Sequence, residues 1–276
     1  MTVAVVTVVH GRHDHLAVQH ESLRHQHRAP DHYVVVAMDD AALTVASLPD
    51  GPEVHVTHIP GGHDGLPLSA ARNTGASHAL ALGADILIFL DVDCVAGERL
   101  VTGYADAVTT QPGVVWSGPV TYLPPPGPTG YCLTSLDALD SPHPARPAPP
   151  PGVTCLEADP DLFWSLSFAV HRDAWLSIGG FCEEYVGYGG EDTDYAQLIL
   201  EAEASLGWAG TPRAYHQHHP SADPPVQHLD AILRNARLFH SRWGRWPMEG
   251  WLQAFAQRGL IQMQGETWVR LPASSR

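Results

Sequence analysis

The first third of the chain alternates between apolar runs and stretches with a helical pattern. The helical stretches are residues 13–26 and 68–83 (LSAARNTGASHALALG). The apolar runs around them predict strands over 2–9 (TVAVVTVV), 32–40 (HYVVVAMDD), 53–59 (EVHVTHI) and 84–93 (ADILIFLDVD). Because strands that alternate with helices are typical of a parallel sheet covered on both faces, we expect an α/β fold with a mostly parallel central sheet.

The remainder of the chain is less regular. Residues 119–152 are proline-rich and weakly patterned, and a loop of this kind is either a functional lid or a disordered insertion. Beyond it we expect a strand over 161–169, helices over 171–180, 193–206 and 228–243, and strand-like sequence over 207–219. We therefore predict one domain over 1–220, with halves of about 1–115 and 116–220, and a helical extension over 221–276 packed on it.

The composition limits the classes of partner. The chain has 276 residues, 44% of them hydrophobic, so it can bury a core without disulfides or a structural metal. Its 30 acidic side chains outnumber the 15 basic ones, which are all arginine, and the formal charge is −15. This balance disfavours nucleic acid, because phosphate backbones are bound by a basic stripe. A small anionic ligand remains compatible with it when a metal ion bridges the charges.

No stretch of the sequence predicts a membrane anchor or a secretion signal. The longest apolar segment, 79–90, is interrupted by Asp85 and is shorter than the roughly 20 residues that cross a bilayer. The apolar start, 2–9, lacks a basic leader and a cleavage site. The four cysteines are scattered without a CxxC pair, as is typical of free thiols in a reducing compartment. We therefore expect a cytoplasmic protein without a transmembrane segment.

Asp91 and Asp93 follow the apolar run ILIFL directly. On an extended segment, side chains two residues apart lie on one face, so both carboxylates should point the same way at the end of a strand, where such sheets bind ligands. Carboxylates are hard oxygen donors that hold Mg²⁺ or Mn²⁺ against a diphosphate. An isolated DxD is weak evidence, however, because an acidic strand end also caps a following helix.

A second acidic group follows a run of glycines in 187–194 (GYGGEDTD). Glycine lets the backbone approach a ligand closely, and Glu191, Asp192 and Asp194 fall in the first turn of a helix, where the helix dipole favours negative charge. Helix capping accounts for one acid, but not for three acids behind glycines and an aromatic residue. One of these carboxylates can act as a general base toward a hydroxyl group.

A third cluster is rich in histidine and covers 215–219 (YHQHH). If the segment is extended, His216 and His218 face one way, while Gln217 and His219 face the other. Imidazole nitrogen combined with carboxylate oxygen suits a borderline ion such as Mn²⁺. Because the chain has 18 histidines, any single one is more often incidental.

The order of these motifs resembles a known family. An acid-terminated second strand, SAARNTGA, LDVD, IGGFCEEYVGYGGEDTD and RAYHQHH follow one another as in the GT-A glycosyltransferases. More narrowly, the chain resembles glycosyltransferase family 2 with the carboxy-terminal segment shared by β-1,4-galactosyltransferases and polypeptide N-acetylgalactosaminyltransferases. The resemblance covers roughly residues 1–220 and implies a GT-A (Rossmann-like) fold that uses a nucleotide sugar, with 1–115 as the nucleotide-sugar half and 116–220 as the acceptor half.

The resemblance also implies roles for individual residues. Asp93 matches the direct metal ligand of the DxD acids, His216 completes the metal shell, and His218 is the backup ligand on the same strand face. Asp192 matches the catalytic base, with Glu191 beside it on the acceptor or the sugar. The implied donor-binding residues are Val8, His10, Arg12, Asp39, Arg72, Asn73, Asp91, Tyr188 and Gly190. Tyr188 stands where the galactosyltransferases have Trp, which leaves the identity of the sugar open.

These roles imply a metal-dependent transfer from a UDP-sugar to an unidentified hydroxyl, with Mn²⁺ or Mg²⁺ and with inversion at the anomeric carbon. The acids of GEDTD match the inverting pattern, although the two relatives combined here differ in stereochemistry. Alternatives are a sugar nucleotidyltransferase, a catalytically silent nucleotide-sugar-binding module and, more remotely, a metal hydrolase built on HQHH. The arginines and aromatics of 234–251 (RNARLFHSRWGRWPMEGW) also leave peripheral membrane contact or an acceptor wall open, although plain core packing is the commoner outcome.

Overall fold

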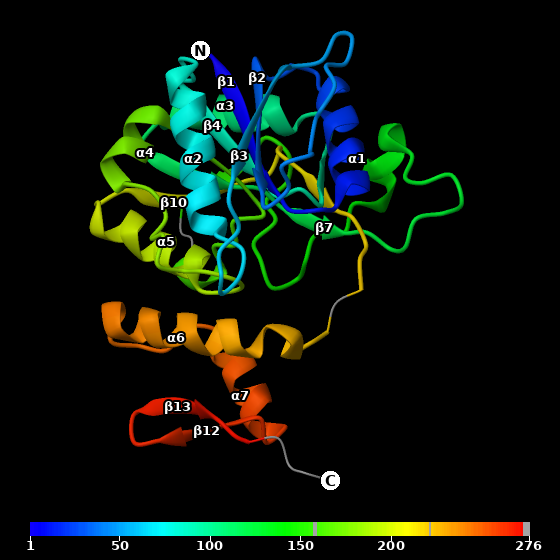
Figure 1. Ribbon diagram of the computed structural model, residues 1–276. Coiled ribbons are helices and arrows are strands. Elements are labelled where there is room, and N and C mark those ends of the chain that lie inside the picture. Colours follow the sequence, from blue (N-terminus) through cyan, green and yellow to red (C-terminus); the bar gives the residue numbers. More distant parts are fainter. Residues whose placement is uncertain (157–158, 221, 273–276) are drawn as a thin grey trace.

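The computed structural model describes residues 1–156, 159–220 and 222–272, and an eight-stranded sheet forms its centre (Figure 1). Its strands are β1 (Val3–Val9), β2 (His32–Met38), β3 (Glu53–Ile59), β4 (Ile86–Leu90), β6 (Val114–Ser117), β8 (Thr154–Cys155), β9 (Ser167–His171) and β10 (Ser205–Ala209). They lie in the order β3-β2-β1-β4-β9-β6-β10-β8. Only β9 and β8 of this sheet pair antiparallel with their neighbours, so the predicted mostly parallel α/β fold is confirmed.

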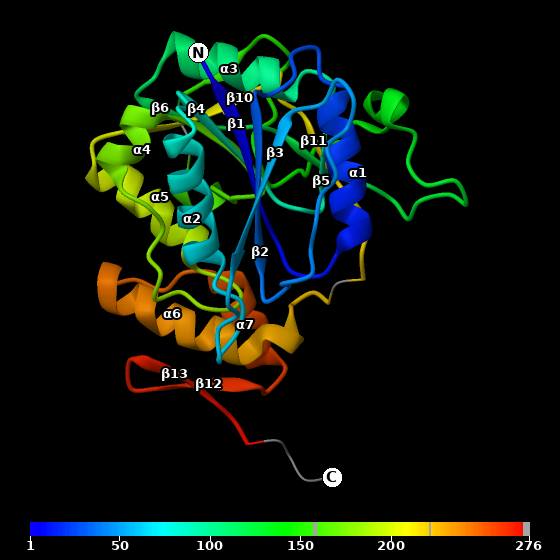
Figure 2. The same cartoon turned by 45° about the horizontal axis from the view of Figure 1, so that its top comes forward.

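Helices cover both faces of this sheet. One face carries α1 (His13–Arg24) and α3 (Leu100–Thr110), and the other carries α2 (Leu68–Ala81), α4 (Arg172–Ile178) and α5 (Glu191–Glu201). Figure 2 shows α1 and α2 on opposite sides of β1, β2 and β3. Successive residues of β1 alternate between the two cores, Val5 in the first and Val6 in the second. This two-sided burial explains why the central strands are apolar throughout.

The segment ARNTG packs α2 tightly on the sheet. A Cβ atom on Gly75 would lie 2.4 Å from Val6 Cγ1, so glycine is needed for this close approach. Arg72 lies one turn earlier, near the start of α2, and is 4% exposed. The packing of Gly75 therefore fixes the place of a buried arginine at the carboxyl edge of the sheet.

The proline-rich segment 119–152 has more structure than its sequence predicts. Its first residues form β7 (Val120–Tyr122), which pairs with β11 (Ala214–His216), and β11 pairs in turn with β5 (Cys94–Ala96). A 3-10 helix, η1 (Leu133–Leu139), follows. This second, three-stranded sheet connects the segment after β4 to the histidine-rich segment.

Two predicted strands have the wrong limits. The strand expected over 161–169 begins only at Ser167, because Asp159 and Pro160 start a 3-10 helix, η2 (Pro160–Leu162), where proline is favoured at the first position. The strand-like stretch 207–219 divides into β10 and β11 around Pro212, which has no N–H to donate to a strand ladder.

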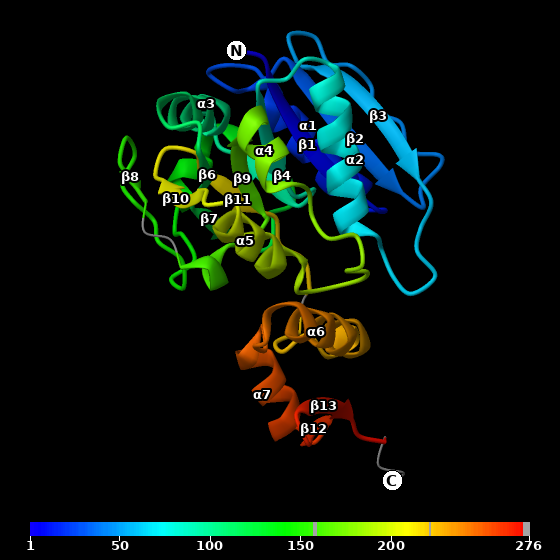
Figure 3. The same ribbon diagram turned by 90° about the vertical axis from the view of Figure 1, so that its left-hand side faces the viewer.

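The carboxy-terminal extension is a small unit with its own core (Figure 3). After the short η3 (Val226–His228), α6 (Leu229–Trp243) and α7 (Glu249–Gln257) pack through Ile232 and Phe255. The extension is not purely helical as predicted, because β12 (Ile261–Gln264) and β13 (Thr267–Arg270) form a hairpin around Gly265, whose φ is +62°. Among the described residues, no helix combines the length and the apolar character needed to span a membrane.

Candidate active site

Asp91, Val92 and Asp93 form a turn at the carboxyl end of β4. The N–H of Cys94 donates to the carbonyl oxygen of Asp91 at 2.8 Å and closes this turn. The segment is therefore not extended, and the prediction that both carboxylates share one face of a strand is wrong. Asp91 and Asp93 follow the strand as expected, but they contact different partners.

Asp93 is surrounded by cationic and imidazole groups. Its Oδ2 accepts a hydrogen bond from Arg12 and lies 3.4 Å from His216 Nε2 and 3.5 Å from His219 Nε2. Burial alone would raise the pKa of this carboxyl, but the hydrogen bonds to the two histidines and the charge of Arg12 outweigh burial and hold the pKa well below its usual range. Asp93 therefore stays ionised.

The residues of this cluster fit a divalent metal ion. One oxygen of Asp93 and one ring nitrogen each of His216 and His219 all lie within 4.8 Å of one another. The other oxygen, Oδ1 of Asp93, is buried without a hydrogen-bond partner among the described residues, and a bound cation would satisfy it. Oxygen with imidazole nitrogen is a donor set that Mn²⁺ accepts. We call Asp93, His216 and His219 the Asp93 cluster.

The structure brings His219, and not His218, to Asp93. Strand β11 ends at His216, so the alternation that would place His218 on the same face stops there. His218 is exposed, and its backbone N–H donates to the hydroxyl of Tyr131 at 3.0 Å. The prediction of His218 as the backup metal ligand on the same strand face as His216 is therefore wrong.

Arg72 joins the turn after β4 to the start of α5. Its guanidinium lies 3.0 Å from Asp91 Oδ1 and 3.3 Å from Glu191 Oε1. Burial would lower the pKa of Arg72, but Asp91 and Glu191 raise it, so the side chain remains charged. The pKa of Asp91 is raised by burial, which its contact with Arg72 opposes. Glu191 keeps one buried oxygen, Oε2, without a hydrogen-bond partner among the described residues.

The loop before α5 is held by the carboxy-terminal extension. Asn235 of α6 donates through Nδ2 to the carbonyl oxygens of Gly189 at 2.8 Å and Val186 at 3.2 Å. The chain then enters α5 through Gly190, whose φ of +94° is rarely adopted by residues with a side chain. Glycine and α6 together set where the first turn of α5 begins.

Asp194 fastens α5 to the end of α6. It is fully buried and accepts hydrogen bonds from Arg242 Nε at 2.7 Å, Trp243 Nε1 at 2.7 Å and the hydroxyl of Tyr185 at 3.0 Å. All three hydrogen bonds are accepted by Oδ1, and Arg242 Nη2 lies 3.5 Å from Oδ2. Asp194 is therefore a structural residue.

Arginines pair with Glu191 and Asp194 of this turn, whereas Asp192 makes no ion pair with an arginine among the described residues. Its Oδ1 accepts a hydrogen bond from the backbone N–H of Thr193 at 2.8 Å, and the side chain is half-buried. Burial and the neighbouring charge of Glu191 raise its pKa to about 7. A carboxylate that ionises near neutral pH is suited to take up a proton.

The remaining predicted donor-binding residues lie at the ends of β1 and β2. Val8 is buried in β1, and the ring of His10 hydrogen-bonds through Nδ1 to the carbonyl oxygen of Met38 at 2.8 Å. Arg12 and Asp39 both adopt left-handed backbone angles, with φ of +49° and +48°. These four residues thus lie at or just beyond the carboxyl ends of the neighbouring parallel strands β1 and β2, where such sheets bind ligands.

Two predicted donor-binding residues make contacts within the chain. The side-chain amide of Asn73 is bound to both backbone polar groups of Phe181 at 2.8 and 2.9 Å and to Glu183 at 2.9 Å, so it clamps a loop. The ring of Tyr188 stacks on His228, with centroids 4.6 Å apart, although the residue keeps 40% exposure. Tyr188 therefore offers an exposed part of its side chain next to the extension.

Arg146 is a buried cation that the sequence analysis did not single out. It lies over the rings of Trp164 and Trp208, at 5.1 and 4.8 Å from their centroids, and none of its three guanidinium nitrogens has a hydrogen-bond partner among the described residues. Burial lowers its pKa to about 10. Its position within a proline-rich segment gave no periodic signal from which this burial could be predicted.

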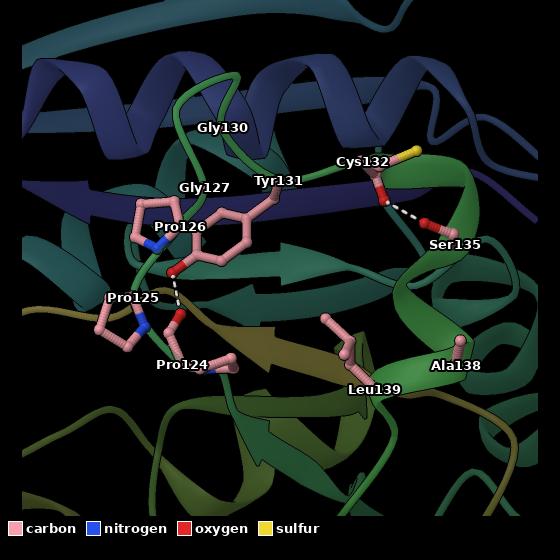
Figure 4. A pocket seen from close by; sticks show the side chains of 10 residues that line it. All are labelled: Pro124, Pro125, Pro126, Gly127, Gly130, Tyr131, Cys132, Ser135, Ala138 and Leu139. Carbon is pink, nitrogen blue, oxygen red and sulfur yellow. Dashed lines mark hydrogen bonds between the residues drawn. The ribbon is translucent and has the colours of Figure 1, made fainter.

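The same proline-rich segment encloses a hollow of about 270 Å³ between Pro124 and Leu139 (Figure 4). The hydroxyl of Tyr131 donates to the carbonyl oxygen of Pro124 at 2.8 Å and closes one side of it. Because the same hydroxyl accepts the N–H of His218, the hollow adjoins the segment that carries the Asp93 cluster.

Residues 160–220 match the family model described as the N-terminal domain of galactosyltransferase, and this segment carries Asp192 and His216. No curated protein matches the chain in sequence. Among solved structures, the crystal structure of GalNAc-T7 with UDP, GalNAc and Mn²⁺ has 14% identity and a TM-score of 0.57, covering 93% of this chain and 57% of that one. S. aureus TarS 1-349 in complex with UDP has 15% identity and a TM-score of 0.57, covering 94% of this chain and 71% of that one.

The chain has the GT-A fold of glycosyltransferases. The resemblance and the fold class predicted from the sequence are thereby confirmed. The family model and the solved structures both support an enzyme of the glycosyltransferase class. This GT-A chain spans little more than half the length of the GalNAc-T7 chain that it matches. Within the GT-A fold, Asp93 follows β4, His216 is the last residue of β11, and Asp192 lies in the first turn of α5.

The arginines of 234–251 make contacts within the GT-A chain. Arg234 contacts the carbonyl oxygen of Val186, Arg237 that of Trp268, Arg242 binds Asp194, and Arg245 pairs with Asp161. These contacts favour the packing interpretation of this stretch over contact with a membrane.

Proposed function

We propose that this chain is a metal-dependent glycosyltransferase that moves a sugar from a UDP-sugar to a hydroxyl group of an acceptor. The observation that carries the proposal is the bridge made by Arg72. It contacts Asp91 in the turn that also carries Asp93, and Glu191 in the turn that also carries Asp192. One buried cation thus keeps a metal-binding turn close to a candidate base, and this closeness is what transfer from a diphosphate to a hydroxyl requires.

In this proposal, Asp93, His216 and His219 hold the metal ion, with Mn²⁺ as the best match and Mg²⁺ as the alternative. When bound, the ion supplies positive charge that stabilises the leaving diphosphate. The metal and the nucleotide are also supported by the fold relatives, since the GalNAc-T7 structure contains UDP and Mn²⁺ and a TarS structure contains UDP. Asp91 takes part through Arg72, whose charge and place it secures.

Asp192 takes the proton of the acceptor hydroxyl. As the acceptor oxygen bonds to the anomeric carbon, the bond from that carbon to the diphosphate breaks, and the electron pair leaves with UDP. Attack from the side opposite the leaving group inverts the anomeric carbon. The support for Asp192 is its pKa near 7. Glu191, whose Oε2 has no hydrogen-bond partner among the described residues, can bind a sugar or acceptor hydroxyl beside it.

The nucleotide would lie at the ends of β1 and β2, where Val8, His10, Arg12 and Asp39 are found. This assigns residues 1–115 to the nucleotide-sugar half and 116–220 to the acceptor half. We also propose a cytoplasmic location, which the four free cysteines support.

The experiment is to measure free UDP released from a panel of nucleotide sugars, without acceptor, in the presence of Mn²⁺, Mg²⁺ or a chelator. We expect slow release from one donor that needs the metal and stops with the chelator. Release that is equal with and without chelator would contradict metal dependence. If no donor is cleaved while calorimetry still detects UDP binding, and addition of candidate acceptors changes nothing, the chain is a silent binding module instead.

A further inference from the structure

A second group of metal-donor side chains lies at the amino-terminal ends of β2 and β3, whereas the Asp93 cluster lies beyond the carboxyl end of β4. His32 is the first residue of β2 and pairs directly with Glu53, the first residue of the edge strand β3. His55 follows Glu53 by two residues, so both side chains lie on one face of β3. We call His32, Glu53 and His55 the His32 cluster.

The distances within the His32 cluster match a coordination shell. His32 Nδ1 lies 3.2 Å from His55 Nε2 and 3.4 Å from Glu53 Oε2, and His55 Nε2 lies 3.8 Å from Glu53 Oε2. A point about 2.0 Å from all three atoms exists at the centre of this triangle, and zinc binds imidazole nitrogen and carboxylate oxygen at about 2.0–2.2 Å. The three atoms therefore already have the spacing of ligands around one ion.

The two imidazoles are largely buried, whereas the carboxylate of Glu53 is exposed to solvent. The side chains of His32 and His55 are 15% and 16% exposed, whereas that of Glu53 is 67% exposed. His78 of α2 packs against His55, with ring centroids 5.4 Å apart, and its Nδ1 shares a 2.8 Å hydrogen bond with Thr57 Oγ1. A neighbouring strand and a helix thus fix the two nitrogen donors, and an ion can approach from the side of Glu53.

We propose that His32, Glu53 and His55 bind one borderline divalent transition-metal ion of the Zn²⁺ class, with water in the remaining position. Two imidazoles and one carboxylate are a usual zinc donor set. The ion would tie the edge strand β3 to β2. This site is independent of the proposed glycosyl transfer, because it lies at the amino ends of β2 and β3 and the Asp93 cluster lies beyond the carboxyl end of β4.

The test is the number of Zn²⁺ ions bound by the whole chain in equilibrium dialysis with elemental analysis. To remove the other cluster, the measurement uses His216→Ala as background. In this background we expect one bound Zn²⁺, and we expect His55→Ala to weaken its binding at least about tenfold. The control is His58→Ala, which changes a histidine on the opposite face of the same strand and should leave binding unchanged.

Folding of each variant is checked by circular dichroism, and Glu53→Gln serves as a second variant because the side chain is largely exposed. Co²⁺ in place of Zn²⁺ adds a spectroscopic readout, since the visible absorption of four-coordinate cobalt should disappear in His55→Ala and weaken in Glu53→Gln. Equal zinc binding by His55→Ala and His58→Ala would overturn the proposal, as would the absence of any zinc bound by the His216→Ala protein.

Discussion

The turn Asp91–Asp93 and the first turn of α5 are both acidic, but Asp93 in the first and Asp192 in the second lie in different electrostatic surroundings. In each turn one acid is bound to Arg72, Asp91 in the first and Glu191 in the second. Asp93, the acid of the first turn that Arg72 does not contact, faces Arg12 and two histidines, and these partners lower its pKa. Asp192 in the second turn makes no ion pair among the described residues, and burial together with the charge of Glu191 raises its pKa to about 7 against the opposing charge of Arg72.

This difference teaches that the partners, and not the residue type, decide what an aspartate can do. A carboxylate whose pKa is held low stays charged and can bind a metal ion, whereas one whose pKa is near 7 can accept and release a proton. Asp194 adds a third outcome, because it is fully buried and three donors from distant segments hold it in a structural role. The predictions below test these three roles.

The largest effect is expected for Asp192→Asn. Removing the base should lower kcat by about 10²–10⁴-fold while donor binding stays intact, because the amide cannot take up the proton. The measurement is turnover of the active donor against its binding constant. Glu184→Gln, an exposed acid on the preceding loop, is the matched control. Near-normal turnover of Asp192→Asn would mean that the base lies elsewhere.

Asp194→Ala should mainly affect stability. It leaves Arg242, Trp243 and Tyr185 without their acceptor, and loss of one partner of a buried ion pair costs about 3–5 kcal/mol. Urea unfolding of the variant measures this cost. Asp230→Ala breaks an exposed pair with Arg270 in the same extension and should cost under about 1 kcal/mol. Equal costs for the two variants would remove the distinction between the buried and the exposed aspartate.

Replacing single histidines tests which of them belong to the Asp93 cluster. His216→Ala and His219→Ala should each weaken Mn²⁺ binding in the presence of UDP by about 10–100-fold, because each removes a nitrogen near Asp93. His218→Ala should leave the affinity unchanged, because this exposed side chain lies outside the cluster. Titration of the three variants with Mn²⁺ separates them, and losses in His216→Ala and His218→Ala without a loss in His219→Ala would restore the assignment made from the sequence.

The smallest effect concerns pH and stability. The pKa of Asp192 is about 7 in the folded chain against 3.8 for an ordinary aspartate, so the folded state holds the extra proton between these values. The stability of the wild type should therefore fall, relative to Asp192→Asn, as pH rises from about 4 to about 7, and the difference should stay constant above that range. Urea unfolding of both metal-free proteins across this range measures it. A gap that shrinks with rising pH would contradict the raised pKa.

The regular parts of the fold could be predicted from the sequence because burial on two faces leaves a strong pattern. Strand β3 has the limits predicted for it, 53–59, and α2 starts at the predicted residue. The order of the motifs was enough to predict the fold family. The hairpin β12–β13 was not predicted, since its strands are short and mostly exposed and carry little apolar signal.

Most residues of the candidate site could be predicted from the sequence, but their contacts could not. Which histidine joins Asp93 depends on where β11 ends, and the sequence YHQHH does not mark that end. The role of Asp194 depends on Arg242, which lies 48 residues further along the chain. The His32 cluster likewise depends on the parallel register of β2 and β3, which places residues 32 and 53 side by side. Contacts between distant segments carry no local pattern.

The most direct test of the account is UDP binding, measured by calorimetry with Mn²⁺ and with chelator, for the wild type, Asp93→Ala and Asp192→Asn. We predict that Mn²⁺ strengthens UDP binding in the wild type and in Asp192→Asn, and that this gain is lost in Asp93→Ala. The same gain in Asp93→Ala as in the wild type, or its loss in Asp192→Asn, would contradict the separate roles of the two aspartates.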